Sequence, residues 1–206
     1  MKISVVPLSL VIALAATQTI ASTTEVTLTG TLMPSACTPT LSNGGVIDFG
    51  RVSFADLIPD GLPEKRLDLS IKCGAPTRFA LINSDNRIES APESPLRYGL
   101  GMHNEEKIGY MTIHTTPALV DDVLRDRISS LDGGQSWSNA VGPFQRAQDR
   151  PNFLYGFGDV NDVSSGPTPA QNLSTTLLVY ARVDSTIDFS SDVQLDGSTT
   201  FEIRYL

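Results

Sequence analysis

Apolar and polar residues alternate along most of this chain, and no other feature of the sequence constrains the fold as strongly. Four segments show the alternation clearly: residues 65–73, 107–115, 175–183 and 199–206. A period of two residues is typical of β-strands with one buried face, because successive side chains point to opposite faces. Stretches rich in Gly, Pro, Asn and Asp separate these segments and indicate turns. The pattern predicts an all-β fold, and we expect an antiparallel β-sandwich.

The region from residue 99 to residue 172 fits a minimal sandwich least well. Within it, residues 118–132 (ALVDDVLRDRISSLD) place apolar side chains at a helical spacing. Residues 130–137 (SLDGGQSW) match the Asp-box pattern S-x-D-x-G-x-[ST]-W, in which the Asp and glycines close a β-hairpin and the Trp packs behind it. We therefore expect a hairpin around Asp132. The helical spacing leaves a helical turn directly before this hairpin as an open alternative. Elaborated loops or an extra hairpin should fill the rest of the region.

The first 21 residues have the features of a signal peptide. Lys2 supplies a positive charge, a short apolar run follows (ISVVPLSLVIALAA), and Thr19-Ile20-Ala21 is a small-x-small cleavage site. The run is too short to span a membrane. We predict cleavage after Ala21, with a cut near Ala15 or Ala16 as the alternative, and an exported product.

The charge of the chain limits its partners. The formal net charge is −8 at pH 7, and loss of the signal peptide removes one lysine and no acidic residue. An acidic surface is repelled by phosphate groups. We therefore expect neither nucleic acid nor anionic lipid as a partner.

Cys37 and Cys73 are the two cysteines of the chain. In an oxidising compartment such a pair predicts one structural disulfide, which should stabilise the fold by roughly 3–4 kcal/mol. The cysteines and the two histidines are scattered and give no metal-ligand spacing. We expect no metal and no other cofactor.

The sequence contains no recognisable catalytic arrangement. His103 and His114 have no G-x-S-x-G elbow or Ser/Asp set to pair with, and we expect them at the surface or at a sheet edge. Asp159, Asn161 and Asp162 alternate oxygen ligands but lack the closing Glu of a calcium loop. A single Asp box indicates a turn, since propeller sialidases carry several in a much longer chain. We therefore expect a protein that is not an enzyme.

The two ends of the chain carry complementary strand patterns. Residues 199–206 alternate up to Leu206, so an immunoglobulin-like sandwich that ends there would keep an open groove beside this strand. Near the other end, one side of a second alternating segment carries Val26, Leu28, Gly30 and Leu32. Burying its three apolar side chains in a neighbour's groove would contribute on the order of 5–9 kcal/mol before ordering costs, and the strand would complete the neighbour's sheet. The alternative is that this segment pairs within its own chain.

Several motifs, taken in order, resemble the subunits of chaperone–usher fimbriae. They are LTGTLMPSACTPTLSNGGVIDFG, LSIKCGAPT and FEIRYL, all behind a signal peptide. IGYMTI and VQLDGSTTFEIRYL are more similar to a branch of fimbrial-like major subunits often described only as a domain of unknown function. The resemblance covers about residues 25–82 and 175–206, whereas the middle region differs from the better-known shaft pilins in length and motif.

The resemblance implies an incomplete immunoglobulin-like β-sandwich that lacks its last strand, completed by a donor strand from a chaperone or a neighbouring subunit. Its parts would be the signal peptide (residues 1–21), a donor-strand extension (22–33) and a pilin-like domain (34–206). Cys37 and Cys73 would join the first two strands of the sandwich. The implied donor residues are Val26, Leu28, Gly30 and Leu32, with Gly30 placed where the groove narrows. The implied groove and chaperone-contact residues are Phe201, Ile203, Tyr205 and Leu206.

The resemblance also implies a function, a location and partners. The protein would be a structural subunit of a surface fimbria, a shaft or adaptor subunit that supports cell adhesion. It would pass through the periplasm to the cell surface. Its partners would be a periplasmic pilus chaperone, an outer-membrane usher, other copies or related fimbrial subunits, and a host or surface receptor. The alternative is a self-contained secreted β-sandwich that binds carbohydrate or another ligand through Trp137 and residues 99–172. A secreted hydrolase is disfavoured.

Overall fold

The structure is a computed structural model that describes residues 24–31, 36–57 and 61–206. The described residues fall into two units, a short N-terminal segment and a body that contains the strands. The predicted signal peptide and the predicted donor residue Leu32 lie outside the described residues. Within the described ranges there is no α-helix, and thus no helix with the length and apolarity that a membrane span requires.

The body contains thirteen strands in its described residues. They are β1 (Cys37–Leu41), β2 (Lys65–Thr77), β3 (Phe79–Asp85), β4 (Tyr98–Gly99), β5 (Met102–His103), β6 (Glu106–Lys107), β7 (Gly109–Thr115), β8 (Ala118–Val120), β9 (Val123–Ser130), β10 (Ser138–Asn139), β11 (Leu154–Gly158), β12 (Ala170–Val183) and β13 (Thr199–Tyr205). Four short 3-10 helices lie between them: η1 (Ser42–Gly45), η2 (Phe54–Asp56), η3 (Ile88–Ser90) and η4 (Val163–Ser165).

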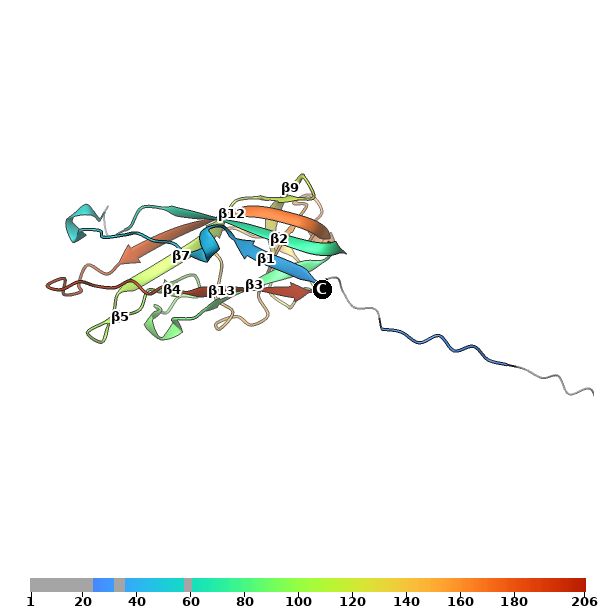
Figure 1. Cartoon of the computed structure of the whole chain (residues 1–206), viewed down its shortest axis with the longest axis horizontal. Helices are drawn as coiled ribbons and strands as arrows, with labels where there is room; N and C mark the ends of the chain where they lie inside the picture. The colour runs from blue at the N-terminus through green and yellow to red at the C-terminus, as the bar shows by residue number, and fades with distance from the viewer. Residues whose placement is uncertain (1–23, 32–35, 58–60) are drawn as a thin grey trace, which may run out of the picture. The chain divides into compact units, whose positions relative to one another are not determined.

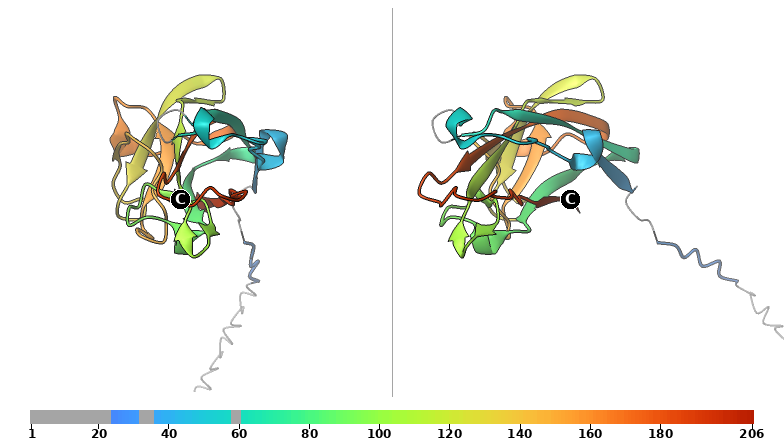
Figure 2. Two further views of the ribbon diagram at one scale, coloured as in Figure 1. Left: turned by 90° about the vertical axis from the view of Figure 1, so that its left-hand side faces the viewer. Right: turned by 60° about the vertical axis from the view of Figure 1, so that its left-hand side comes forward.

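Eleven strands form one antiparallel sheet that is nearly closed into a barrel (Figures 1 and 2). Its order is β1-β2-β12-β8-β9-β11-β3-β13, with β7 and β10 attached to β12 and β9, and β4 attached to β7. The two ends of this path are β1 and β13. Among the described residues, β1 pairs with β2 alone and β13 with β3 alone. The all-β prediction is confirmed, while the immunoglobulin-like arrangement and the missing last strand stay predictions.

The alternating segments bury their apolar faces as predicted. Strands β2, β7 and β12 supply about half of the main core, with buried residues Leu67, Leu69, Ile71, Cys73, Met111, Ile113, Ala170, Leu173, Leu177, Val179, Ala181 and Val183. Strand β13 differs from them. Its inward-facing residues Phe201 and Ile203 pack against the core but are only half-buried. The core is therefore incompletely covered beside β13.

Residues 118–130 form a β-hairpin, so a helical turn before the Asp box is wrong. The turn residues Asp121 and Asp122 have φ of 45° and 66°, as a two-residue type I′ hairpin turn requires. Leu119 lies opposite Leu124 across β8 and β9. The spacing of apolar residues that suggested a helix is thus produced by the cross-strand pairs Val120–Val123 and Leu119–Leu124, which are three and five residues apart in the sequence.

The loop after β9 has the predicted Asp-box form. Strands β9 and β10 pair across it, and the Ser130 hydroxyl lies 2.6 Å from the Asp132 carboxylate. Hydrogen bonds from the side chains of Ser130 and Ser136 hold the pKa of Asp132 well below its usual range. Trp137 donates from Nε1 to the Gly134 carbonyl (3.1 Å) and packs against a small apolar cluster on β3 and β11. Trp137 thus serves the packing of this loop.

Candidate functional site: a groove between β1 and β13

The sheet is open between β1 and β13, and two adjoining cavities lie along this opening. We call them the inner and the outer cavity, and together the groove. One wall of the groove comes from residues 41–57 and the other from residues 189–201. Ile47, Phe49 and Leu195 line both cavities and therefore stand between them.

The inner cavity reaches the hydrophobic core. Its volume is about 230 Å³, and its lining includes the buried residues Leu67, Ile113 and Val179 of β2, β7 and β12. Leu41 lines one side of this cavity and Phe201 the other. No described strand covers the core here, so the floor of the inner cavity is ready to receive apolar side chains.

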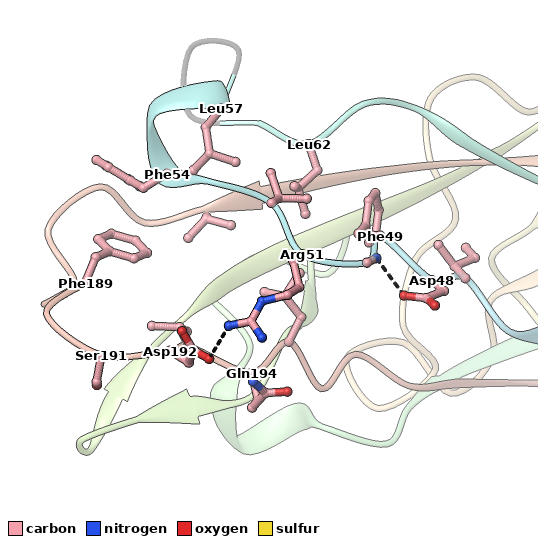
Figure 3. A pocket seen from close by; sticks show the side chains of 16 residues that line it. Asp48, Phe49, Arg51, Phe54, Leu57, Leu62, Phe189, Ser191, Asp192 and Gln194 are labelled. Carbon is pink, nitrogen blue, oxygen red and sulfur yellow. Dashed lines mark hydrogen bonds and ion pairs between the residues drawn. The ribbon is translucent and has the colours of Figure 1, made fainter.

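The outer cavity is larger, with a volume of about 590 Å³, and its lining combines phenylalanine and aliphatic side chains with polar and charged ones (Figure 3). Phe49 and Phe54 line it from one side and Phe189 from the other, while Leu62 and Val183 are its most buried residues. It is more polar than the inner cavity at its mouth, where charged side chains project toward solvent.

The walls of the groove offer main-chain groups as well as apolar side chains. Residues 46–50 and 192–198 run along the two sides of the groove and belong to no strand. They continue the outer edges of β1 and β13, which have no partner strand among the described residues. Sheet edges with free N–H and C=O groups are templates for pairing with another extended chain. The groove therefore has the chemistry of a site for a β-strand.

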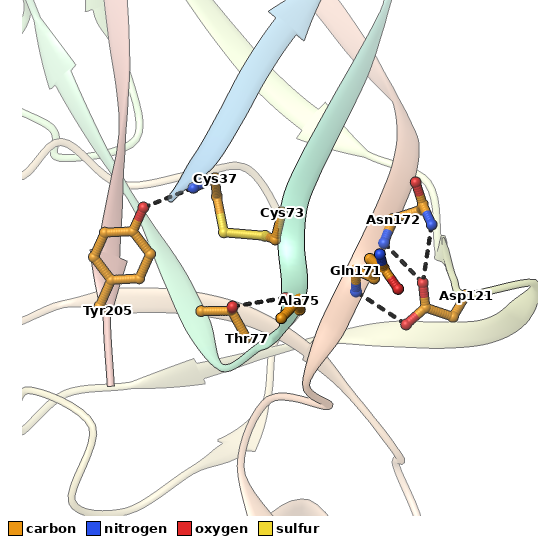
Figure 4. The surroundings of a disulfide bond; sticks show 8 residues. All are labelled: Cys37, Cys73, Ala75, Thr77, Asp121, Gln171, Asn172 and Tyr205. Carbon is orange, nitrogen blue, oxygen red and sulfur yellow. Dashed lines mark hydrogen bonds between the residues drawn. A yellow bond between two sulfur atoms is a disulfide. The ribbon is translucent and has the colours of Figure 1, made fainter. Parts of the chain in front are cut away.

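The inner end of the groove is held by covalent and hydrogen bonds (Figure 4). The predicted disulfide between Cys37 and Cys73 is confirmed, and it joins β1 to β2. The backbone N–H of Cys37 donates to the Tyr205 hydroxyl (2.8 Å), which ties the start of β1 to the end of β13. Beyond β13, the Leu206 N–H donates to the Arg78 carbonyl (3.2 Å).

The disulfide should contribute strongly to stability. Replacing both cysteines (Cys37→Ser/Cys73→Ser) is expected to lower the free energy of unfolding by roughly 3–4 kcal/mol, because the bridge closes a loop across 36 positions of the chain. Urea unfolding of the oxidised protein and of this variant measures the difference. Reduction of the native protein provides the control and should give the same shift. Equal midpoints for the oxidised and bridge-free proteins would contradict this role.

The predicted groove residues lie where the sequence placed them, on β13 and just after it. Phe201 lines the inner cavity and packs edge-on against the Phe144 ring at 5.6 Å between centroids. Ile203 is half-buried on the same face, whereas Tyr205 and Leu206 are 40% and 46% exposed. Of these four residues, Phe201 lines a cavity of the groove, and the groove and chaperone contacts of the four stay predictions.

The predicted donor segment belongs to the N-terminal unit, which is separate from the body. Residues 24–31 form no strand, and Val26 and Leu28 are 92% and 96% exposed. A Cβ added at Gly30 would have no atom within 4 Å. The alternative, that this segment pairs within its own chain, stays a prediction.

Sequence reasoning missed the outer cavity. The sequence feature that corresponds to this cavity is a repeated tripeptide, Ile-Asp-Phe, at residues 47–49 and 187–189. Each copy places its Phe in the lining of the outer cavity, from opposite walls. Two short apolar motifs that are 140 residues apart in the sequence carry no indication that they face each other.

The residues considered for catalysis or metal binding have local structural roles. His114 lies on β7 with its ring edge-on to Tyr180, and burial and the nearby Arg127 lower its pKa. Asp159 accepts from the backbone N–H of Asn161, and Asp162 accepts from neighbouring serines. Within residues 24–31, 36–57 and 61–206, no group of three or more His, Cys, Asp or Glu side chains is placed to hold a metal ion.

The described residues define an all-β protein whose main sheet is nearly closed into a barrel. The sequence model of a family described as "Protein of unknown function (DUF1120)" matches residues 26–116. Protein GltF of Escherichia coli (strain K12) is 27% identical to this chain, over 95% of the chain and 93% of GltF. Uncharacterized protein YhcF of the same organism is 25% identical, over 85% of the chain and 87% of YhcF. The family match includes the exposed N-terminal segment as well as β1 to β7 of the body.

Proposed function

We propose that this protein is a structural subunit of a surface fimbria and that it polymerises by strand exchange. The groove of one copy takes the N-terminal extension, residues 22–33, of the next copy. The observation that carries the proposal is the groove itself, in which two cavities lie along the opening of the sheet between β1 and β13. A strand bound there would complete the sheet and cover the exposed part of the core.

The pattern of the extension fits the shape of the groove. Leu28 and Leu32 lie four residues apart, about 13 Å in an extended strand, and Gly30 lies midway between them on the same face. The groove has two cavities with Phe49 and Leu195 between them. We therefore assign one leucine to each cavity and the glycine to the position between them, where a side chain would meet the residues that separate the cavities.

The same groove would serve earlier partners in assembly. An incomplete sandwich of the immunoglobulin-like type exposes its core until a strand is supplied, so a periplasmic chaperone would supply one first and an outer-membrane usher would follow. The predicted signal peptide supports export to that compartment. The disulfide between Cys37 and Cys73 supports the same view, because such bridges persist in oxidising compartments. Adhesion of cells to a host or other surface would be the role of the assembled fimbria.

The alternative role in ligand binding receives no support from Trp137. Its Nε1 group is engaged by the Gly134 carbonyl, and its ring packs against the apolar cluster at β3 and β11. A stacking platform for carbohydrate needs an open aromatic face. We therefore assign function to the groove and a structural role to the Asp box.

Strand exchange makes a simple prediction for material sheared from the surface of producing cells. On SDS gels, unheated samples should show a ladder of oligomers that collapses to the monomer on boiling, because each joint is held by a buried strand rather than by a covalent bond. Deletion of residues 22–33 is the control, and it should leave a folded subunit that gives no ladder. A monomer in both lanes, or unfolding of the deletion variant, would contradict the proposal.

A further inference from the structure

Two side-chain contacts cross the mouth of the outer cavity and join its opposite walls (Figure 3). The first is an ion pair between Arg51 Nη2 and Asp192 Oδ2, at 2.9 Å. The second is a stack of the Phe54 and Phe189 rings, with centroids 4.1 Å apart and planes inclined by 27°. All four residues line the cavity, two from each wall.

The ion pair lies on the solvent side of the cavity, whereas the Phe189 ring of the stack is partly buried against the core. The Arg51 and Asp192 side chains are 91% and 77% exposed, whereas Leu62 and Val183 at the bottom are 8% and 7% exposed. The space of about 590 Å³ lies between the two levels. A strand that is laid into the outer cavity from solvent must therefore pass the ion pair and the ring stack.

The two ends of the groove differ in how they are held. At the inner end, β1 is a regular strand that the disulfide joins to β2 and that the hydrogen bond from Cys37 to Tyr205 joins to β13. At the outer end, the walls are segments outside the strands, and the ion pair and the ring stack join them. An ion pair this exposed is weak and is screened by salt. The outer end is thus the end that opens.

We propose that Arg51, Asp192, Phe54 and Phe189 form a clasp that closes the outer cavity of the free subunit and limits the rate at which a strand is taken up. The inference rests on the proposed function, because it assigns a control step to the same groove. If the clasp is weakened, the groove takes up a strand faster; if the clasp is fixed, uptake stops. The cavities below the clasp set the preference of the groove for one strand over another.

Locking the clasp is the first arm of the test. Arg51→Cys/Asp192→Cys is prepared in the full chain and treated with a short bifunctional maleimide; Cys37 and Cys73 do not react because they are joined in a disulfide. The matched control is the same variant capped with N-ethylmaleimide. The probe is a fluorescent peptide with the sequence of residues 22–33, and its association is followed by anisotropy. We expect association at least about tenfold slower in the cross-linked protein than in the capped protein.

Charge variants form the second arm. Arg51→Asp places two acidic side chains opposite each other, and it should speed peptide association by about two- to fivefold relative to the native protein. The exchange Arg51→Asp/Asp192→Arg restores the pair and should restore the native rate. Added NaCl should speed association for the native protein and for the exchanged protein, in which it screens an attraction, and slow it for Arg51→Asp, in which it screens a repulsion.

The outcomes separate the clasp from the strand-exchange function. Slow association of the cross-linked protein together with a faster Arg51→Asp variant supports the clasp. If the peptide binds the native protein and the cross-linked and capped proteins take it up at equal rates, the clasp is wrong and the groove assignment stands. If the peptide binds none of the proteins, the proposed function fails, and the clasp fails with it.

Discussion

Gly30→Phe is expected to abolish the heat-sensitive ladder of oligomers while the body of the subunit folds as before. In the free chain, a side chain at this position meets nothing within 4 Å. In the bound state that we propose, the same side chain would press on the residues between the two cavities, chiefly Phe49 and Leu195. Overpacking of this kind costs about 1–3 kcal/mol, or up to about a hundredfold in affinity, for a tightly packed site.

The neighbouring Thr29 provides the matched control. It lies on the opposite side of the extension from Val26, Leu28 and Gly30, so Thr29→Phe should assemble nearly as well as the native protein. Gly30→Ala should fall between the two. Assembly is read from SDS gels of unheated samples, and folding from the thermal midpoint of each variant. Normal ladders from Gly30→Phe would show that this glycine faces no constriction.

Asp85→Ala is expected to lower the free energy of unfolding by about 3–5 kcal/mol. The Asp85 side chain is fully buried, and it accepts hydrogen bonds from the backbone N–H groups of Arg87 (2.8 Å) and Gly99 (2.9 Å). Arg146, whose side chain is 3% exposed, lies 3.8 Å from the same carboxylate. Removing the carboxylate leaves this cation and two N–H groups buried without that partner. Because Asp85 also pairs with Thr199, where β13 begins, the loss should loosen one wall of the groove.

Urea unfolding tests this prediction, with Asp149→Ala as the control. Asp149 binds the same arginine (2.7 Å) but is 38% exposed, so its removal should cost clearly less. The double variant Asp85→Leu/Arg146→Met should recover part of the loss, because it removes the buried charge together with its partner. An Asp85→Ala midpoint equal to that of Asp149→Ala would contradict the role given to Asp85.

Local patterns in the sequence were enough to predict the long alternating strands. The two-residue alternation in β2, β7 and β12 is set by which side chains face the core, and a one-residue shift would expose all of them. The disulfide could be predicted equally well, because a chain with two cysteines has a single possible pairing within the chain. These features depend on short segments or on residue counts, and the structure confirms them.

Features that depend on contacts between distant segments could not be predicted from the sequence in the same way. The 118–130 hairpin was obscured because its cross-strand leucines mimic a helical stripe. The outer cavity needs the two Ile-Asp-Phe tripeptides on opposite walls, and the pair of Asp85 and Arg146 needs two loops to meet. Each of these arrangements is fixed by the order of strands in the sheet. A single sequence does not reveal that order, since many orders satisfy the same alternation.

Photo-crosslinking between copies tests the strand-binding role of the groove most directly. A benzophenone amino acid replaces Leu28 in an equal mixture of isotope-labelled and unlabelled subunits, and cross-linked peptides are identified by mass spectrometry. The same substitution at Thr29 is the control for the opposite face. We predict mixed-isotope cross-links from position 28 to residues that line the groove, such as Leu41, Phe49 and Phe201. Cross-links confined to one copy, or mixed links that fall outside the groove, would contradict strand exchange.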